Sequence, residues 1–400
     1  LFLAQSLASA GFIAAATLNS IIGAQLGGSS GWAGVPSAVY LLAGAFAASA
    51  WGALMERFGR RNGIAAGLAL GVLGAALVVI AINTSALLLF LVGMIFMGAA
   101  NAAIQLGRFA AAEVNTPERR GSAISNVVLG GTVGAIFGPL LVGPTGKFVM
   151  TLGMNELSGA YLATLILFVL SSLTIFLGLR PEPRDVGRSL AKKFPESTPH
   201  GEARPVAVIL RQPAARTAVL AMVLGQVVMV ALMVITSLHM KGHHHPLSDI
   251  SAVIASHTFG MYAFSILSGR LADKWGRGPV ILIGAGTLLL ACLAAPLSPN
   301  LLPLAVSLFL LGLGWNFCFV GGSALLADQL SPAERARTQG TNDLLVGLAS
   351  AAASLSSGFI FAATSYTVIA LVSAALTAIL FTMTLIWVRR GHPQKFPGSM

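Results

Sequence analysis

The sequence predicts an all-α polytopic membrane protein with 12 transmembrane helices in two six-helix, pseudo-symmetric halves. Hydrophobic residues make up 56% of the 400 residues and charged residues only 9%, which a water-soluble globule would not show. Apolar runs of about 20 residues, the length that crosses about 30 Å of hydrocarbon as a helix, recur between charges, Gly and Pro. One short motif also occurs twice, once in each half of the chain.

Twelve runs have the length and apolarity of a membrane span, with boundaries that shift by about 2–4 residues. They cover residues 1–26, 32–54, 63–82, 85–112, 122–145, 157–179, 215–239, 248–271, 278–296, 300–327, 338–363 and 366–388. The first run begins at Leu1, already apolar, so we expect residues to precede it and the run to be a retained helix. Cys292 and Cys318 both lie in predicted helices, which implies no disulfide framework.

Lys and Arg gather in alternate loops, which sets the expected orientation because cytoplasmic loops accumulate them. The basic loop residues outside the central linker include Arg57, Arg60, Arg61, Arg119, Arg120, Arg270, Lys274, Arg277, Arg335 and Arg337. The opposite loops carry only Lys147 and Lys241. We therefore expect both termini to be cytoplasmic, and the net charge of +11 to reflect topology and not nucleic-acid binding.

A polar stretch rich in Pro and charge separates the sixth and seventh runs. It predicts an N-terminal six-helix half at 1–180, a cytoplasmic linker at 181–214 and a C-terminal half with a short cytoplasmic tail at 215–400.

Two sequence matches between the halves indicate that the halves are repeats. GALMERFGRRNGI, 52–64, matches GRLADKWGRGPVI, 269–281, at an offset of 217 positions. Asn101 and Glu113 match Asn316 and Asp328 at an offset of 215. Many secondary transporters are built from two such repeats, with the substrate site near the membrane midplane between them.

The motif G-x-L-x-D/E-R/K-x-G-R after the second and eighth spans resembles the signature loop of the major facilitator superfamily. The resemblance implies the fold of that superfamily and secondary transport, not an enzyme. We expect Asp273 and Arg277, with Glu56 and Arg60 in the first copy, to act in gating or coupling on the cytoplasmic side. Glu56 lies one position later in its motif than Asp273 does in the second copy.

Two further features accompany this motif. The glycine-rich run at 130–139 also resembles the family, and its spacing predicts tight helix packing. The sequence holds no phosphate-binding G-x-x-x-x-G-K-S/T motif, which disfavours ATP-driven pumping.

Thioether and imidazole side chains gather in the seventh and eighth runs. Four methionines fall within about 40° on one helical face, namely Met222, Met229, Met233 and Met240. His257 and Met261 are four residues apart, hence on one face of the next helix. Counted from the outer helix ends, Met229 and His257 have similar depths, about ten and nine residues in. A Met stripe is often packing alone, but an ionisable His in hydrocarbon usually faces a cavity or partner.

Thioether sulfur and imidazole nitrogen form a soft, neutral ligand set that suits Cu(I) and poorly suits Mg or Ca. M-x-x-x-M on the seventh helix followed by H-x-x-x-M on the eighth resembles the CcoA-like copper importers of the superfamily, which supply cbb-type cytochrome c oxidase. The resemblance implies copper uptake across the bacterial inner membrane along Met229, Met233, His257 and Met261. Copper is then the transported substrate, and no cofactor is expected to stay bound.

The remaining partners and polar residues follow from this interpretation. We expect a lipid bilayer around a monomer, and a cytoplasmic copper chaperone as receiver. Residues that could collect metal at the outer entrance are His239, Met240, His243, His244 and His245, although a solvated loop explains them equally well. Arg108 and Asp343 could act in proton or gating relays.

Two other functions stay open at the level of sequence. One is proton-coupled efflux of small amphipathic drugs, with the Met stripe as an adaptable apolar wall. The other is a membrane-embedded binding or assembly partner that binds metal without transporting it. Metal sensitivity of growth or oxidase activity separates copper import from drug efflux. A binding or assembly partner would bind metal but accumulate no radioactive copper in vesicles.

Overall fold

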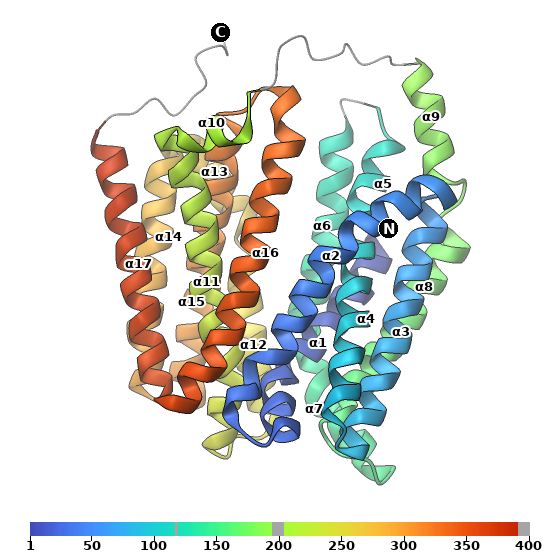
Figure 1. Ribbon diagram of the computed structural model, residues 1–400, viewed down its shortest axis with the longest axis vertical. Coiled ribbons are helices and arrows are strands. Elements are labelled where there is room, and N and C mark those ends of the chain that lie inside the picture. The colour runs from blue at the N-terminus through green and yellow to red at the C-terminus, as the bar shows by residue number, and fades with distance from the viewer. Residues whose placement is uncertain (117–118, 194–203, 391–400) are drawn as a thin grey trace. The chain divides into compact units, whose positions relative to one another are not determined.

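The computed structural model describes residues 1–116, 119–193 and 204–390. The chain divides into two compact helical units, which are coloured from blue to green and from green to red in Figure 1. Unit 1 comprises Leu1–Glu196 and Met240–Ala255, and unit 2 comprises Ser197–His239 and Ser256–Met400. The predicted division at 180 and 214 stays a prediction, since part of the linker and the tail after 390 lie outside the described residues.

Unit 1 is built from the N-terminal helices. They are α1 (Phe2–Gly27), the 3-10 turn η1 (Ser30–Gly34), α2 (Val35–Phe58), α3 (Arg60–Thr84), α4 (Leu87–Gln105), α5 (Gly107–Glu113), α6 (Arg120–Phe137), η3 (Pro139–Leu141), α7 (Val142–Thr151), α8 (Ser158–Gly178) and α9 (Pro183–Lys193). Within this unit α1 packs against α6 and α8, and α3 packs against α4 and α8.

The later helices form most of unit 2. They are α10 (Val206–Arg211), α11 (Pro213–Gly242), α12 (Leu247–Tyr262), α13 (Ser265–Trp275), α14 (Arg277–Ala294), η4 (Ala295–Leu297), α15 (Leu301–Ala327), α16 (Pro332–Ala363) and α17 (Tyr366–Arg389). Within unit 2, α14 packs against α15 and α17. The last turn of α11 and the first half of α12 group with unit 1.

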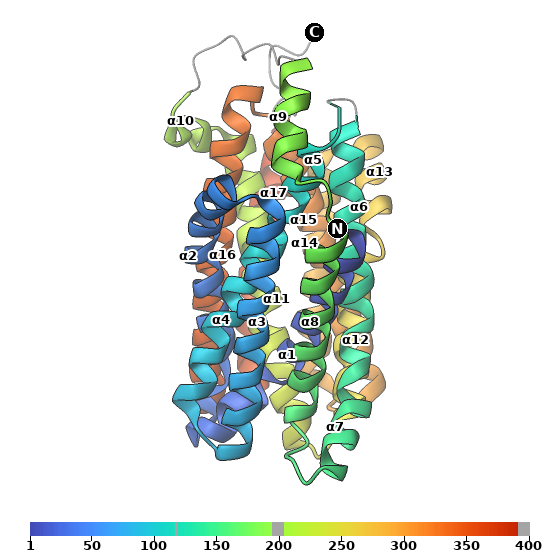
Figure 2. The same ribbon diagram turned by 90° about the vertical axis from the view of Figure 1, so that its right-hand side faces the viewer.

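The described residues contain 12 helical spans long and apolar enough to cross a membrane. The predicted all-α fold with 12 transmembrane helices is therefore confirmed. The linker region also holds two short helices that the sequence analysis did not predict, α9 and α10. Figure 2 shows α9 beyond the end of α8, where it packs against α5.

Three predicted spans are interrupted. The fifth breaks between α6 and α7 at Gly138 and Pro139, because proline cannot donate a backbone hydrogen bond and its ring clashes with the preceding turn. The fourth is interrupted at Leu106 and the eighth between Tyr262 and Ser265. Neither of these two has a proline at the break.

The predicted close packing of the glycine-rich run is confirmed in unit 1. Gly130 and Gly134 lie one turn apart on α6, and Gly138 lies one turn later at the junction of α6 with η3. All three face the backbone of α1. A Cβ at Gly134 would lie 1.9 Å from the Ser6 carbonyl oxygen. Only glycine allows the two backbones to approach this closely, and α1 is thereby held in the centre of unit 1.

Candidate functional site

His257 is a fully buried imidazole in α12 of unit 2, with 0% of its surface exposed. Its Nδ1 lies 2.9 Å from the Leu308 carbonyl oxygen on α15. A carbonyl oxygen only accepts, so Nδ1 carries the proton and Nε2 presents a lone pair. Nε2 is buried and has no hydrogen-bond partner within the described residues. A neutral imidazole fixed through Nδ1 is the usual arrangement of a metal-ligating histidine.

A close helix crossing produces this arrangement. A Cβ at Gly312 on α15 would lie 2.2 Å from the His257 carbonyl oxygen, and a Cβ at Gly260 on α12 would lie 2.4 Å from the Phe309 carbonyl oxygen. The two glycines therefore let α12 and α15 meet backbone to backbone. This contact brings the Leu308 carbonyl within reach of a side chain on the neighbouring helix.

Met261 lies at the end of α12, just before the break in the eighth span, and its side chain is buried. The Asn316 side-chain nitrogen donates to the Met261 carbonyl oxygen at 2.6 Å and to Ser265 Oγ at 2.8 Å. Asn316 Oδ1 also accepts from the Ser268 hydroxyl. One side chain of α15 thus binds both sides of the break and fixes where Met261 stands.

The methionine stripe lies on α11, where Met222, Met229 and Met240 are buried and Met233 is half-buried. α11 continues to Gly242, three residues beyond the predicted end. Met233 lies nine residues before Gly242, and His257 lies ten residues after Leu247, the start of α12. The expected depth match of His257 with Met229 is therefore corrected to Met233, one helical turn nearer the loop.

The described residues contain no group of three or more His, Cys, Asp or Glu side chains placed to hold a metal ion. A hard-ligand or zinc-type centre is therefore not formed there. Coordination by thioethers and one imidazole uses a different donor set, and the joint site of Met229, Met233, His257 and Met261 stays a prediction.

The predicted entrance residues occupy different environments. His243 and His244 are exposed in the loop, and His245 Nδ1 lies 3.3 Å from Asp249 Oδ2 in the first turn of α12. Met240 is 0% exposed inside α11, so its thioether is enclosed by protein and does not stand in the loop. His239, also inside α11, stacks on Tyr366 with ring centroids 4.3 Å apart. Sequence analysis missed Asp249. Its position, four residues after the last of three consecutive histidines, was the available signal.

Sequence analysis also missed a polar and aromatic cluster in unit 2. Trp315 Nε1 donates to Gln226 Oε1 at 2.6 Å, and the Trp315 ring stacks on Phe319 with centroids 4.9 Å apart. The Met222 sulfur accepts from Ser323 Oγ at 3.3 Å and from Asn342 Nδ2 at 3.5 Å. Gln226 in an apolar span was the available signal, because polar groups in hydrocarbon usually have a partner or a function.

The two copies of the signature loop share one backbone geometry. Gly59 has φ +95° and ψ 157°, and Gly276 has φ +90° and ψ 162°. These values suit glycine and strain other residues. In each copy the next residue is an arginine that opens the following helix.

Those two arginines, Arg60 and Arg277, pair with the matching acidic residues Glu113 and Asp328. Arg60 Nε donates to Glu113 at 3.0 Å, and its Nη2 also binds Glu113. Arg277 donates to Asp328 at 3.1 Å and to Asp273 at 2.5 Å. Each unit therefore carries its own ionic latch at the same end of the repeat, and the gating role of these residues stays a prediction.

The first signature loop has an additional partner from the linker. Glu182 Oε1 accepts from the backbone nitrogens of Arg60 and Arg61, at 2.5 and 3.2 Å. Arg184 Nη1 donates to the carbonyl oxygens of Glu56 and Arg57 at 3.0 Å. Glu182 thus caps the positive end of α3, and Arg184 binds the negative end of α2.

The two remaining candidate relay residues differ in burial. The Arg108 guanidinium carbon lies 4.9 Å from the Phe109 ring centroid, and its buried Nε has no partner within the described residues. Asp343 is exposed on α16. The proposed role of Arg108 and Asp343 in a proton or gating relay therefore stays a prediction.

The chain matches the family model described as Major Facilitator Superfamily over residues 1–253 and 217–399. The chain belongs to the major facilitator superfamily. This major facilitator protein is 34% identical over 389 residues to the uncharacterised MFS-type transporter YdeG of Bacillus subtilis (strain 168), across 97% of this chain and 90% of YdeG. It is 28% identical to the riboflavin transporter RfnT of Brucella anthropi, across 86% of this chain and 84% of RfnT.

The fold of this major facilitator protein is similar to that of the nucleoside transporter NupG. The TM-score is 0.74 at 15% sequence identity, across 97% of this chain and 98% of NupG. Membership shows a polytopic secondary transporter and not an enzyme. The names of these relatives do not include copper as a cargo.

Proposed function

We propose that this major facilitator protein imports copper, as Cu(I), across the bacterial inner membrane by alternating access, and so supports assembly of cbb-type cytochrome c oxidase. The observation that carries the proposal is His257, whose Nδ1 is held by the Leu308 carbonyl while Nε2 is buried without a partner. Leaving a buried polar atom unpaired costs about 1–3 kcal/mol. A cargo that binds Nε2 would remove this cost.

The proposed ligands suit a cargo that must be both bound and released. Imidazole and thioether are neutral, so a bound Cu(I) keeps a single positive charge and is not trapped by a buried anion. Met261 lies one turn after His257 on the same face of α12, and Met233 has a similar depth on α11. Met229 lies one turn farther along the stripe, where it would receive the ion next.

The entrance and the gates complete the proposed cycle. His243, His244 and the pair of His245 with Asp249 would raise the local copper concentration at the outer loop. The latches of Arg60 with Glu113, and of Arg277 with Asp273 and Asp328, would form and break as access alternates. By the charge rule both termini face the cytoplasm, where a copper chaperone would receive the ion from a monomeric transporter.

Radioactive copper uptake into cells or vesicles under reducing conditions tests this function. The variants His257→Ala and Met233→Leu remove a ligand, and Met233→Leu keeps the side-chain volume. Met94→Leu is the matched control, because Met94 is a buried methionine of α4 in unit 1. We expect uptake to fall at least about tenfold in both ligand variants, since Cu(I) prefers few soft ligands, and to stay unchanged in Met94→Leu. Normal uptake by both ligand variants, at normal membrane levels, would refute the copper site.

A planar heterocyclic solute is the second candidate cargo. The stacked rings of Trp315 and Phe319, with Gln226 bonded to Trp315, form a surface on which an aromatic ring could stack. The relative RfnT is named a riboflavin transporter. Uptake of labelled riboflavin that is lost in Trp315→Ala but kept in His257→Ala would favour this candidate. Drug efflux, the alternative from the sequence, has no specific observation in its favour.

A further inference from the structure

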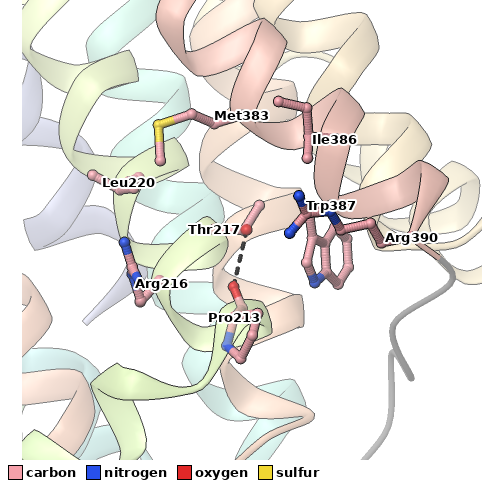
Figure 3. Close-up of a pocket in the computed structure, with 8 residues that line it drawn as sticks. All are labelled: Pro213, Arg216, Thr217, Leu220, Met383, Ile386, Trp387 and Arg390. Atoms are coloured by element: carbon pink, nitrogen blue, oxygen red, sulfur yellow. Dashed lines mark hydrogen bonds between the residues drawn. The ribbon is translucent and has the colours of Figure 1, made fainter.

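A pocket opens at one end of unit 2, between the first turns of α11 and the last turns of α17 (Figure 3). Arg216 of α11 and Arg390, the residue that follows α17, line it together with Trp387, which has 5% of its surface exposed. Figure 3 shows Arg390 beside the indole of Trp387, with Thr217 and Pro213 of α11 on the side toward Arg216. His257, on α12, is not among the residues that line the pocket.

The side-chain donors of Arg216, Arg390 and Trp387 in this pocket have no acceptor among the described residues. Both guanidinium groups are exposed, and neither forms an ion pair or a hydrogen bond with a described residue. Trp387 Nε1 is buried and likewise has no hydrogen-bond partner within the described residues. The Thr217 hydroxyl already donates to the Pro213 carbonyl oxygen at 2.9 Å. The pocket therefore offers two positive charges and one indole N–H to an anion.

The other side of the pocket is apolar. Leu220, Met383 and Ile386 line it, and the last two are 38% and 45% exposed on α17. Both helices belong to membrane-spanning segments, so this side continues along faces with the length and apolarity to meet acyl chains. Tryptophan and arginine at the end of a span are typical of the membrane–water interface.

We propose that this pocket binds an anionic phospholipid. The phosphate lies between Arg216 and Arg390, the indole N–H of Trp387 donates to a phosphate or ester oxygen, and the acyl chains follow Leu220, Met383 and Ile386. Guanidinium groups suit phosphate because their planar donors match its oxygens. The apolar lining favours a lipid over free phosphate, which would leave that side of the pocket uncovered.

The test measures binding of phosphatidylglycerol to the purified full chain in detergent, by native mass spectrometry and by thermal stabilisation. Phosphatidylcholine and inorganic phosphate are the comparison ligands. We expect phosphatidylglycerol to bind at least about tenfold more tightly than phosphatidylcholine, because each arginine near an anionic headgroup contributes about fivefold. Inorganic phosphate at the same concentration should give no stabilisation.

Three variants locate the site. Arg216→Gln with Arg390→Gln should lose about tenfold or more in affinity, and Trp387→Phe, which keeps the ring but removes the N–H, should lose about threefold to tenfold. The control pair Arg211→Gln with Arg335→Gln removes the same charge from exposed arginines of unit 2 that do not line the pocket. That control should bind as the parent does.

Each contrary result overturns the proposal. Equal affinity of the Arg216 and Arg390 variant and the parent would place the lipid elsewhere. Equal binding of phosphatidylcholine would remove the charge argument, and equal stabilisation by inorganic phosphate would make the pocket a free-anion site. A truncation after Arg390 should bind as the parent does, whereas binding that appears only after truncation would make the tail the occupant.

Discussion

Asn316 is a single residue that connects two helices and a helix break. Its side chain donates to the Met261 carbonyl and to Ser265, and accepts from Ser268. Asn316 is 2% exposed, so water does not replace these bonds when they are lost. Asn316 therefore connects α12, α13 and α15 through side-chain hydrogen bonds.

We predict that Asn316→Ala lowers the free energy of unfolding by about 1–3 kcal/mol, because it leaves a buried carbonyl without a donor. It should also weaken copper uptake at low supply, because Met261 is no longer held. Thermal unfolding in detergent and uptake kinetics measure the two effects. Asn62→Ala, at an exposed position of α3, is the control and should change neither. A variant as stable as the parent would show that the break holds without Asn316.

Glu334 is a buried carboxylate at the start of α16, outside the membrane-spanning segment, with a side chain 2% exposed. Arg204 Nε donates to it at 2.7 Å and Arg204 Nη2 at 2.9 Å. The Ser331 backbone nitrogen donates to it at 3.0 Å, which completes a capping box. The hydrogen bonds from Arg204 lower the pKa of Glu334 from 4.5 to about 2.

This pKa predicts how stability depends on pH. The folded-state pKa is below the unfolded one, so the pair stabilises the fold above about pH 4.5 and loses that effect as the pH falls toward 2. Glu334→Gln should therefore destabilise the protein at pH 7, on the order of 3 kcal/mol. The gap to the parent should shrink between pH 4.5 and 2 in thermal unfolding. Asp185→Asn, in an exposed pair with Arg184, should show a gap near zero at every pH.

The first signature loop shows how one helical element is fixed by a segment far away in sequence. Gly59 joins α2 to α3, and Glu182 from beyond α8 caps the first backbone nitrogens of α3. A Cβ at residue 59 would lie 2.8 Å from the Glu182 carboxyl carbon. The loop is therefore restricted both by its positive φ and by the cap.

We predict that Gly59→Ala costs about 1–3 kcal/mol, because alanine is strained at φ +95° and displaces the cap. Gly52→Ala is the control from the same motif, since nothing lies within 4 Å of a Cβ there. It should be neutral or slightly stabilising, because alanine favours the helix more than glycine does. Thermal unfolding of both variants in detergent decides the matter. Equal melting temperatures of Gly59→Ala and Gly52→Ala would contradict the proposed strain at residue 59.

At the scale of the whole molecule, the distribution of charge predicts the orientation in the membrane. Cys292 and Cys318 are both fully buried, which gives a low background for thiol labelling. We predict that His243→Cys in intact cells reacts with a membrane-impermeant maleimide. Arg211→Cys, at an exposed position of α10, should react only after the cells are permeabilised. Labelling of Arg211→Cys in intact cells would reverse the proposed orientation.

The sequence by itself determined the features that depend on local composition. Twelve apolar runs gave the twelve spans, the repeated loop gave the matched Gly59 and Gly276, and the glycines at 130, 134 and 138 gave the packing against α1. Each of these is encoded in a short window, because a span needs only length and apolarity and close packing needs only small residues at helical spacing.

Tertiary structure decided the features that depend on contacts between distant residues. The break in the eighth span has no proline and is held by Asn316, 55 positions from Met261. The free Nε2 of His257 follows from the Leu308 carbonyl 51 positions away, and the Trp315 indole meets Gln226 across 89 positions. A hydrogen bond depends on distance and direction to about an ångström. Helix periodicity fixes which face a residue occupies, whereas only the packed neighbours fix what that residue touches.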